Sequence, residues 1–267
     1  MQNIPADDAM AVAIVTAIQQ GDAASLARQL EQHPHLATAR IVDRKGTSRT
    51  LLHVVADWPG HVPNGAQMVA TLAAAGADMS AAAMHTCSES APETPLHWAA
   101  SSDDVRVLDA LLDHGADIEA PGAVFTGGPA MSDAVVFAQW KAARRLLERG
   151  ATTTLWQAAA LGLLTRVQQC CTATPAPADT EITNALWHAC RGGQLEVADY
   201  LLARGASLNW VGWDRKTPLD AAVDSGSEEL VTWLRAHGAT CRTQDNTIKN
   251  DSSARDAAGS RVRRHAR

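Results

Sequence analysis

The sequence TPLHWAA at residues 94–100, followed by LLDHGADIEA at residues 111–120, decides the fold. Thr94 and Pro95 are typical of a helix start, because threonine caps the first turn and proline fits the first helical position. Apolar residues continue at helical spacing, and Gly115 is expected to end a second helix in the left-handed conformation. The stretch therefore predicts two short helices followed by a turn.

The same frame returns several times along the chain. The interval from an apolar residue of the first helix to the glycine after the second helix is 19 residues in four places. These pairs are Leu96 and Gly115, Met131 and Gly150, Leu186 and Gly205, and Leu219 and Gly238. Helical pairs that recur in this way predict a solenoid, in which each repeat stacks on its neighbours.

Residues 94–120 resemble the signature of the ankyrin repeat family, and TPLDAA at 217–222 repeats part of it. The resemblance implies an all-α fold, an ankyrin-repeat solenoid of about seven helix-turn-helix units with short β-hairpin fingers. We assign this solenoid to residues 1–240, with the clearest repeats in the third, sixth and seventh units. In the family, the histidine of TPLH helps to hold the hairpin turn, and the resemblance gives that role to His53 and His97.

The repeat register is broken in three places. Five extra residues lie within residues 57–67, DWPGHVPNGAQ, and their Pro and Gly content predicts a loop between the two helices of the second repeat. The finger over residues 79–93 is six residues longer than the finger of the seventh repeat, and the finger after Gly150 is nearly absent. The Pro/Ala-rich link after the fifth repeat predicts a break or a change of curvature at residues 172–182.

Charge is distributed unevenly over the chain. The net charge is -6, whereas residues 241–267 hold seven Lys or Arg against three Asp and therefore carry +4. We expect this basic C-terminal tail to be disordered, because it has few large apolar residues. The segment RVRRHAR either contacts nucleic acid or an acidic partner, or is a solvated terminus. The preceding 240 residues carry -10, which argues against nucleic-acid binding by the body of the protein.

The sequence predicts neither membrane insertion nor a disulfide framework. The longest apolar stretch, residues 9–18, is too short to span a bilayer, and the first residues lack a basic targeting region. Five cysteines without paired spacing indicate reduced thiols. We therefore expect a soluble cytoplasmic protein.

We expect no cofactor and no metal site. His53, Asp57 and His61 lie four residues apart, but Pro59 and Gly60 are expected to end the helix before His61, so the three side chains would share no face. The sequence lacks nucleophile-elbow, phosphate-loop and dinucleotide-binding motifs. Enzymatic activity is left open, and the absence of these motifs favours a non-catalytic protein.

Tryptophan dominates the aromatic residues, with eight Trp beside two Phe and one Tyr. Trp156 and Trp187 are assigned to the place of the TPLH histidine, so we predict that packing of their rings replaces a polar contact. Trp98 takes the variable position after His97, which by the resemblance lies on the first helix near the concave face, and we expect its ring to be partly exposed. Partly exposed aromatic rings are the usual centres of binding surfaces, although scattered exposed apolar side chains also occur without function.

These observations support three hypotheses about function. In the first, the solenoid binds a protein partner through its concave face and fingers. The candidate contacts are Trp58, Glu93, Trp98, Asp133, His188, Trp210 and Trp213. In the second, irregular repeats two to four form a small-molecule-binding or catalytic pocket around Trp98 and Asp133. There the indole and the carboxylate would suit a cationic group, or the carboxylate would act as an acid. A solvated aspartate with neither role is the remaining alternative. In the third, the basic tail of one chain docks on the acidic body of another.

Overall fold

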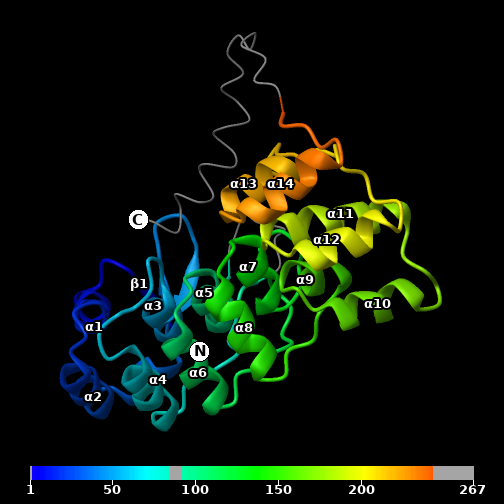
Figure 1. The fold of residues 1–267 in the computed structure, drawn as a ribbon. Coiled ribbons are helices and arrows are strands. Elements are labelled where there is room, and N and C mark those ends of the chain that lie inside the picture. The colour runs from blue at the N-terminus through cyan, green and yellow to red at the C-terminus, as the bar shows by residue number, and fades with distance from the viewer. Residues whose placement is uncertain (1, 85–91, 243–267) are drawn as a thin grey trace. The chain divides into compact units, whose positions relative to one another are not determined.

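The computed structural model describes residues 2–84 and 92–242, and these divide into two compact parts at Ala151 and Thr152. We call residues 2–151 the N-lobe and residues 152–242 the C-lobe, and Figure 1 shows their helices. The N-lobe helices are α1 (Ala9–Gln19), α2 (Ala23–Gln32), α3 (Leu51–Ala56), α4 (Gly65–Ala74), α5 (Pro95–Ser101), α6 (Val105–Asp113), α7 (Ala130–Val136) and α8 (Trp140–Glu148). The C-lobe helices are α9 (Leu155–Ala160), α10 (Leu164–Thr172), α11 (Asp179–Arg191), α12 (Leu195–Leu202), α13 (Pro218–Ser225) and α14 (Glu228–Ala236).

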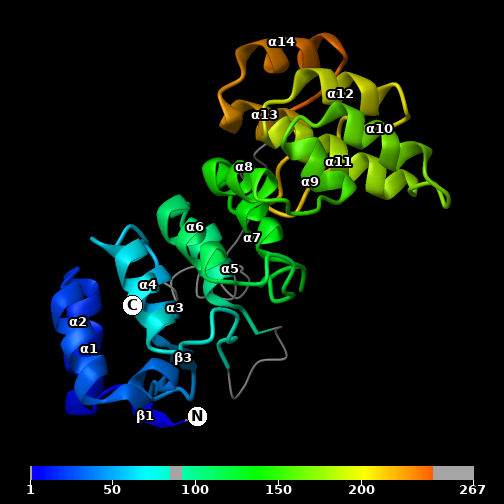
Figure 2. The ribbon, with the colours of Figure 1, turned by 90° about the horizontal axis from the view of Figure 1, so that it is seen from below.

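The N-lobe is a row of antiparallel helix pairs in chain order, as Figure 2 shows. The first helix of each pair packs beside the first helix of the next, in the order α1, α3, α5 and α7. The second helices form a parallel row of α2, α4, α6 and α8. Each interior pair therefore buries its apolar stripe between its two neighbouring pairs, which is how stacked repeats share one core.

A small sheet precedes α3 in the N-lobe. Strand β2 (Arg40–Val42) pairs antiparallel with β3 (Ser48–Thr50), and β1 (Asn3–Pro5) pairs parallel with β2. A short 3-10 helix, Pro34–Thr38, leads into β2. The strands β2 and β3 form a β-hairpin finger of the predicted kind, and Gly46 closes its turn at a φ of 80°, a conformation that favours glycine.

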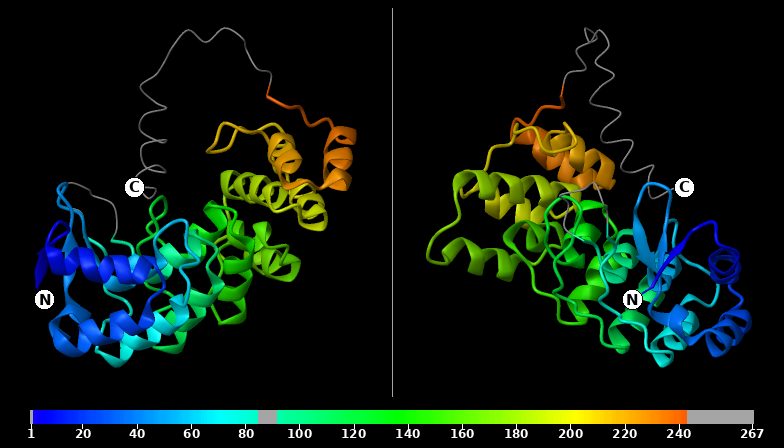
Figure 3. Two further views of the ribbon diagram at one scale, coloured as in Figure 1. Left: turned by 90° about the vertical axis from the view of Figure 1, so that its left-hand side faces the viewer. Right: turned by 180° about the vertical axis from the view of Figure 1, so that it is seen from behind.

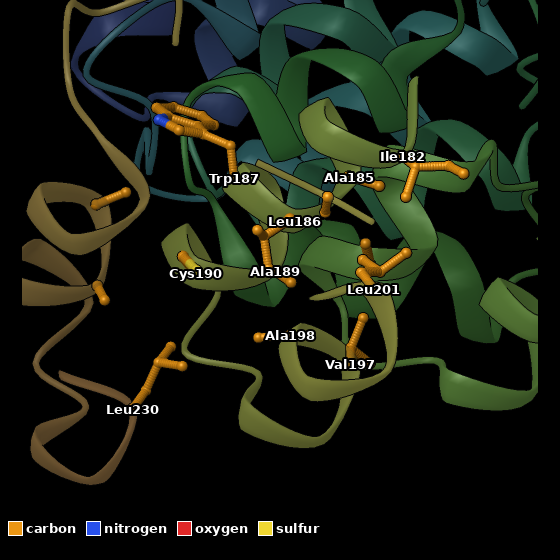
Figure 4. Close-up of a cluster of buried hydrophobic side chains, with 14 of the residues drawn as sticks. Ile182, Ala185, Leu186, Trp187, Ala189, Cys190, Val197, Ala198, Leu201 and Leu230 are labelled. Atoms are coloured by element: carbon orange, nitrogen blue, oxygen red, sulfur yellow. The ribbon is translucent and has the colours of Figure 1, made fainter. Parts of the chain in front are cut away.

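The C-lobe has its own row of helices, in which α11 packs between α9 and α13. Leu186 and Ala189 of α11 lie in the core with Val197 and Leu201 of α12, and Trp187 lies at the edge of this cluster (Figure 4). The loop between α12 and α13 extends beyond the helices of the lobe, as the golden segment in both views of Figure 3 shows. The C-lobe therefore combines a small apolar core with one projecting finger.

The predicted fold class is confirmed, because the described residues are mostly helical and the strands form a repeat hairpin. The predicted loop in residues 57–67 is present between α3 and α4, where it occupies residues 57–64, while residues 65–67 belong to α4. Six residues join α8 to α9, where the finger is nearly absent. Residues 172–182 lie inside the C-lobe, and a change of curvature there stays a prediction. The finger residues 85–91 and the tail residues 243–267 lie outside the described residues.

Within the described residues, no helix is long and apolar enough to cross a membrane. The same residues contain no group of three or more His, Cys, Asp or Glu placed to hold a metal ion. His53, Asp57 and His61 have separate neighbours: His53 is buried in α3, Asp57 pairs with Arg49 at 2.5 Å, and the His61 backbone N–H donates to Asp104. These three side chains therefore do not share one face of a helix, as predicted.

Candidate functional site

Two histidines link neighbouring helix pairs through hydrogen bonds at both ring nitrogens. The Thr94 backbone N–H donates to Nδ1 of His97 at 3.1 Å, so the ring proton resides on Nε2, which donates to the Gly128 carbonyl at 3.2 Å. His53 bonds in the same way to the carbonyl of Glu93, at 3.1 Å. Burial lowers the pKa of His53 to about 3, so the ring is neutral at physiological pH. These histidines have the structural role that the family resemblance implies.

Trp187 takes over this link in the C-lobe. Its indole Nε1–H donates to the Lys216 carbonyl at 2.9 Å, and the residue is 2% exposed. The ring therefore keeps a hydrogen bond, whereas packing alone was predicted. The assignment of Trp156 to the histidine position is wrong, because Gln157 occupies it and its Oε1 accepts from the Thr154 backbone N–H at 2.8 Å.

The projecting finger of the C-lobe is a tight turn held against Trp187. The Gly212 N–H donates to the Lys216 carbonyl at 2.8 Å, and the Arg215 N–H donates to the Gly212 carbonyl at 3.1 Å. Gly212 is in contact with the indole, since a Cβ there would lie 2.5 Å from Cε2 of Trp187. We call residues 209–217 the Trp213 finger. Its base is fixed to α11 through both the backbone and the tryptophan ring.

Trp213 lies on this finger with 85% of its surface exposed, and Val211 beside it is 45% exposed. Trp210, by contrast, is half-buried and packs against the C-lobe core. An ion pair between Lys216 and Asp224 and a hydrogen bond from Arg242 Nη1 to the Arg215 carbonyl, at 3.2 Å, add further attachments. The finger therefore presents a large apolar ring on a well-held backbone.

His188 is buried among aromatic rings, where the sequence predicted a contact residue. Its ring centroid lies 4.7 Å from that of Trp156 and 4.9 Å from that of Trp187. Burial, together with the positive charge of Arg191, lowers its pKa to about 3. Its Nδ1 has no hydrogen-bond partner within the described residues. Arg191 was not among the predicted contacts, and its guanidinium lies 5.8 Å from the Trp187 ring centre.

The two candidate tryptophans of the N-lobe differ in exposure. Trp98 is 6% exposed and meets the ring of His53 edge-on, with 4.9 Å between centroids. The expectation that Trp98 is partly exposed is wrong, because the ring packs against the preceding helix pair. Trp58, in the loop between α3 and α4, is 55% exposed.

Asp133 is the most unusual side chain of the N-lobe. It is 0% exposed, and neither carboxylate oxygen has a hydrogen-bond partner in the described part of the chain. Burial raises the pKa of Asp133 well above its usual value, and the nearby Glu93 carboxylate raises it further, while the backbone N–H of Val124 acts in the opposite direction. Glu93 is itself buried, with 5% exposed. Two acidic groups are therefore close together away from solvent.

A glycine-rich loop, residues 122–128, lies over these acids, and we call it the covering loop. The Gly128 carbonyl accepts hydrogen bonds from the backbone N–H of Gly122 at 2.9 Å and of Ala123 at 2.8 Å, in addition to the bond from His97. Gly122 lies close to the Glu93 segment, because a Cβ there would be 3.1 Å from the Glu93 Cα. The run PGAVFTGG at residues 121–128 could have predicted a loop, but its position over Asp133 depends on the tertiary fold.

A hollow of about 480 Å³ lies elsewhere in the N-lobe, at β1 and the turn between β2 and β3. Its lining residues are Pro5, Ala6, Asp7, Val42, Asp43 and Arg44. The candidate residues from the sequence do not line this hollow. It therefore adds no support to a pocket around Trp98 and Asp133.

Two family models agree with the repeats described above. Residues 155–245 match a family model of three copies of the ankyrin repeat, and residues 93–123 match the model of one ankyrin repeat. Among solved structures, the human ASB11 ankyrin repeat domain is 20% identical and aligns with a TM-score of 0.46 over 83% of this chain and 96% of that chain. No curated protein matches the sequence.

Proposed function

Because the chain is an ankyrin-repeat protein, and ankyrin repeats are generally protein-interaction modules, we propose that it binds a protein partner through its fingers and the adjoining concave helix face. Within the C-lobe, the Trp213 finger is the main proposed contact. The other proposed contacts are Trp58, Glu93, Trp98, Asp133, His188 and Trp210. The buried members of this set act by shaping the surface or become accessible when the partner binds.

The observation that carries this proposal is the combination of exposure and order at the Trp213 finger. An indole that is 85% exposed leaves its apolar surface in water in the free protein. Covering the ring with a partner would bury this surface, which is favourable. Hydrogen bonds from Trp187 and Gly212 to the Lys216 carbonyl already fix the backbone below it. A partner therefore pays little ordering entropy when it binds, and this favours tryptophan as a hot-spot residue.

Affinity capture with Trp213→Ala tests the proposal. We expect a protein captured by the parent from native lysate to be lost or reduced at least tenfold, because alanine truncation of a hot-spot residue costs about 2 kcal/mol or more. Trp58→Ala serves as the comparison, since it removes another exposed indole among the proposed contacts, from a loop outside the fingers. Both variants should melt like the parent. If Trp213→Ala retains every captured protein, the proposal is contradicted. If the captured protein is lost with Trp58→Ala alone, the contact lies in the inserted loop instead.

A small-molecule-binding or catalytic site around Asp133 is the second candidate function. Asp133 favours it, because a buried acid without hydrogen bonds destabilises the fold and such groups are concentrated at functional sites. Mass spectrometry of small molecules that co-purify with the parent and with Asp133→Ala tests this candidate. A compound that is present with the parent and absent with the variant is the expected result.

A further inference from the structure

Arg215 occupies a backbone position in the Trp213 finger that favours glycine. The hydrogen bonds between Gly212, Arg215 and Lys216 close the turn, and Arg215 lies in the left-handed region with a φ of 64°. Glycine is the usual residue in this conformation, because the Cβ of any other residue crowds the following carbonyl oxygen. Strained residues of this kind are concentrated at functional sites. The turn itself therefore does not favour arginine, and a use for the Arg215 side chain would explain it.

The Arg215 guanidinium is exposed and has no acidic partner. Among the described residues, its side chain forms neither an ion pair nor a hydrogen bond. A second guanidinium lies next to it, because Nη1 of the exposed Arg242 donates to the Arg215 carbonyl at 3.2 Å. The Arg242 guanidinium also lacks an acidic partner in the described part of the chain. The finger therefore carries two positive charges that no ion pair offsets.

The acidic groups around the finger are already bound within the C-lobe. Lys216 forms ion pairs with Asp224 and, at 3.6 Å, with Asp214. The Asp220 carboxylate accepts hydrogen bonds from the backbone N–H of Thr217 at 2.9 Å and of Arg242 at 3.1 Å. These carboxylates are therefore engaged by other donors, and the two arginines remain open to an external anion.

We propose that the Trp213 finger binds an acidic segment of the partner protein, whose carboxylates pair with Arg215 and Arg242 while an apolar side chain beside them covers Trp213. This inference rests on the proposed function and adds the chemical class of the partner. Trp213 precedes Arg215 by two residues, so their Cα atoms lie within about 7.6 Å and one short segment can contact both. A guanidinium offers a planar set of N–H donors that matches the two oxygens of a carboxylate.

The charge of the C-lobe favours a short acidic segment over a nucleic acid. Residues 152–242 hold seven Lys or Arg against nine Asp or Glu and therefore carry -2. A long polyanion would extend past the finger and be repelled by these acids, because binding of its phosphates needs a wider basic face. A short peptide segment would contact only the tip of the finger. Complementary charge therefore points to carboxylates on a protein.

Selection of peptides from a phage-displayed random library, with the full-length protein as the target, tests the inference. We expect the selected peptides to be enriched in Asp and Glu beside a large apolar residue. Added NaCl should weaken their binding, because exposed charge pairs are screened by salt. In fluorescence anisotropy, Arg215→Gly should bind a selected peptide at least about tenfold more weakly, because charge-assisted hydrogen bonds are lost.

The variants at position 215 separate binding from folding. Arg215→Gly should melt at or above the temperature of the parent, because glycine adopts the left-handed conformation without strain. Arg215→Lys keeps the charge but not the planar donor set, so it should bind more tightly than Arg215→Gly and less tightly than the parent. Arg235→Ala removes an exposed arginine from α14 and is the control, which should bind like the parent.

The outcomes also separate this inference from the proposed function. If Trp213→Ala abolishes binding but the selected peptides show no excess of acidic residues, or bind Arg215→Gly like the parent, the acidic segment is overturned and the finger remains a protein contact. If Trp213→Ala and Arg215→Gly both bind like the parent, the finger is not the contact and both proposals are contradicted. If an oligothymidylate binds more tightly than the peptides and depends on Arg215, the ligand is a nucleic acid and the inference is overturned.

Discussion

Asp133 makes the stability of the N-lobe depend on pH. Its folded-state pKa is raised, so the protonated acid stabilises the fold fully below the unfolded pKa of about 3.9, and this contribution is lost as pH rises through the folded pKa. Asp133→Asn removes the titration. In urea unfolding, the free energy of unfolding of the variant should therefore rise relative to that of the parent by up to about 1.4 kcal/mol per pH unit from pH 4 upwards. The difference should level off above the folded-state pKa.

The same measurement on two other variants identifies the source of this effect. Asp199→Asn is the control for the loss of one carboxylate, because Asp199 is exposed. Glu93→Gln should narrow the pH range over which the titration of Asp133 changes the unfolding free energy, since the Glu93 charge contributes to the raised pKa of Asp133. His97 adjoins Glu93, and burial lowers the pKa of its imidazole. A constant difference between Asp133→Asn and the parent from pH 4 to 8 would rule out titration of Asp133 in the folded state.

Side-chain roles that depend on local sequence were predictable, and those that depend on distant segments were not. The cap formed by Thr94 and His97 follows from residues three apart on one helix turn. Trp156 was misassigned because a shift of one residue turns a side chain by about 100° around a helix, and Gln157 faces the cap instead. The burial of Asp133 depends on the covering loop, and the burial of Trp98 on a histidine 45 residues earlier, so neither is encoded in a nearby pattern.

The Trp213 finger and helix α11 depend on each other through the contact of Gly212 with Trp187. In Gly212→Ala the new Cβ would lie 2.5 Å from the indole, so the finger or the ring must move. We expect a loss of about 1–3 kcal/mol of unfolding free energy, as is usual for overpacking. Trp187→His removes most of the ring, so Gly212→Ala should cost less in that background. Urea unfolding of the two single variants and the double variant measures this coupling.

A second glycine distinguishes packing from backbone strain in this experiment. Gly205 has a φ of 90°, and a Cβ there would meet nothing within 4 Å, so Gly205→Ala acts through its backbone conformation. Its cost should be the same with tryptophan or histidine at position 187. If Gly212→Ala is equally insensitive to residue 187, the finger is not held by the indole. The contact with Trp187 would then not pre-order the finger that carries the exposed Trp213.

The division of the chain at Ala151 and Thr152 predicts that the two lobes lose their structure separately. Each lobe has its own row of helices, and the C-lobe has its own apolar cluster, so neighbouring repeats within a lobe support one another. Leu201→Ala in the C-lobe and Leu111→Ala in the N-lobe each truncate a leucine that is 0% exposed, at an expected cost of about 2–5 kcal/mol. Native-state hydrogen exchange should show each variant losing amide protection in its own lobe while the other lobe keeps the protection of the parent. If either variant loses amide protection in both lobes, the chain unfolds as one cooperative unit. Ligands at Trp213 and at Asp133 would then stabilise the same unfolding transition instead of separate ones.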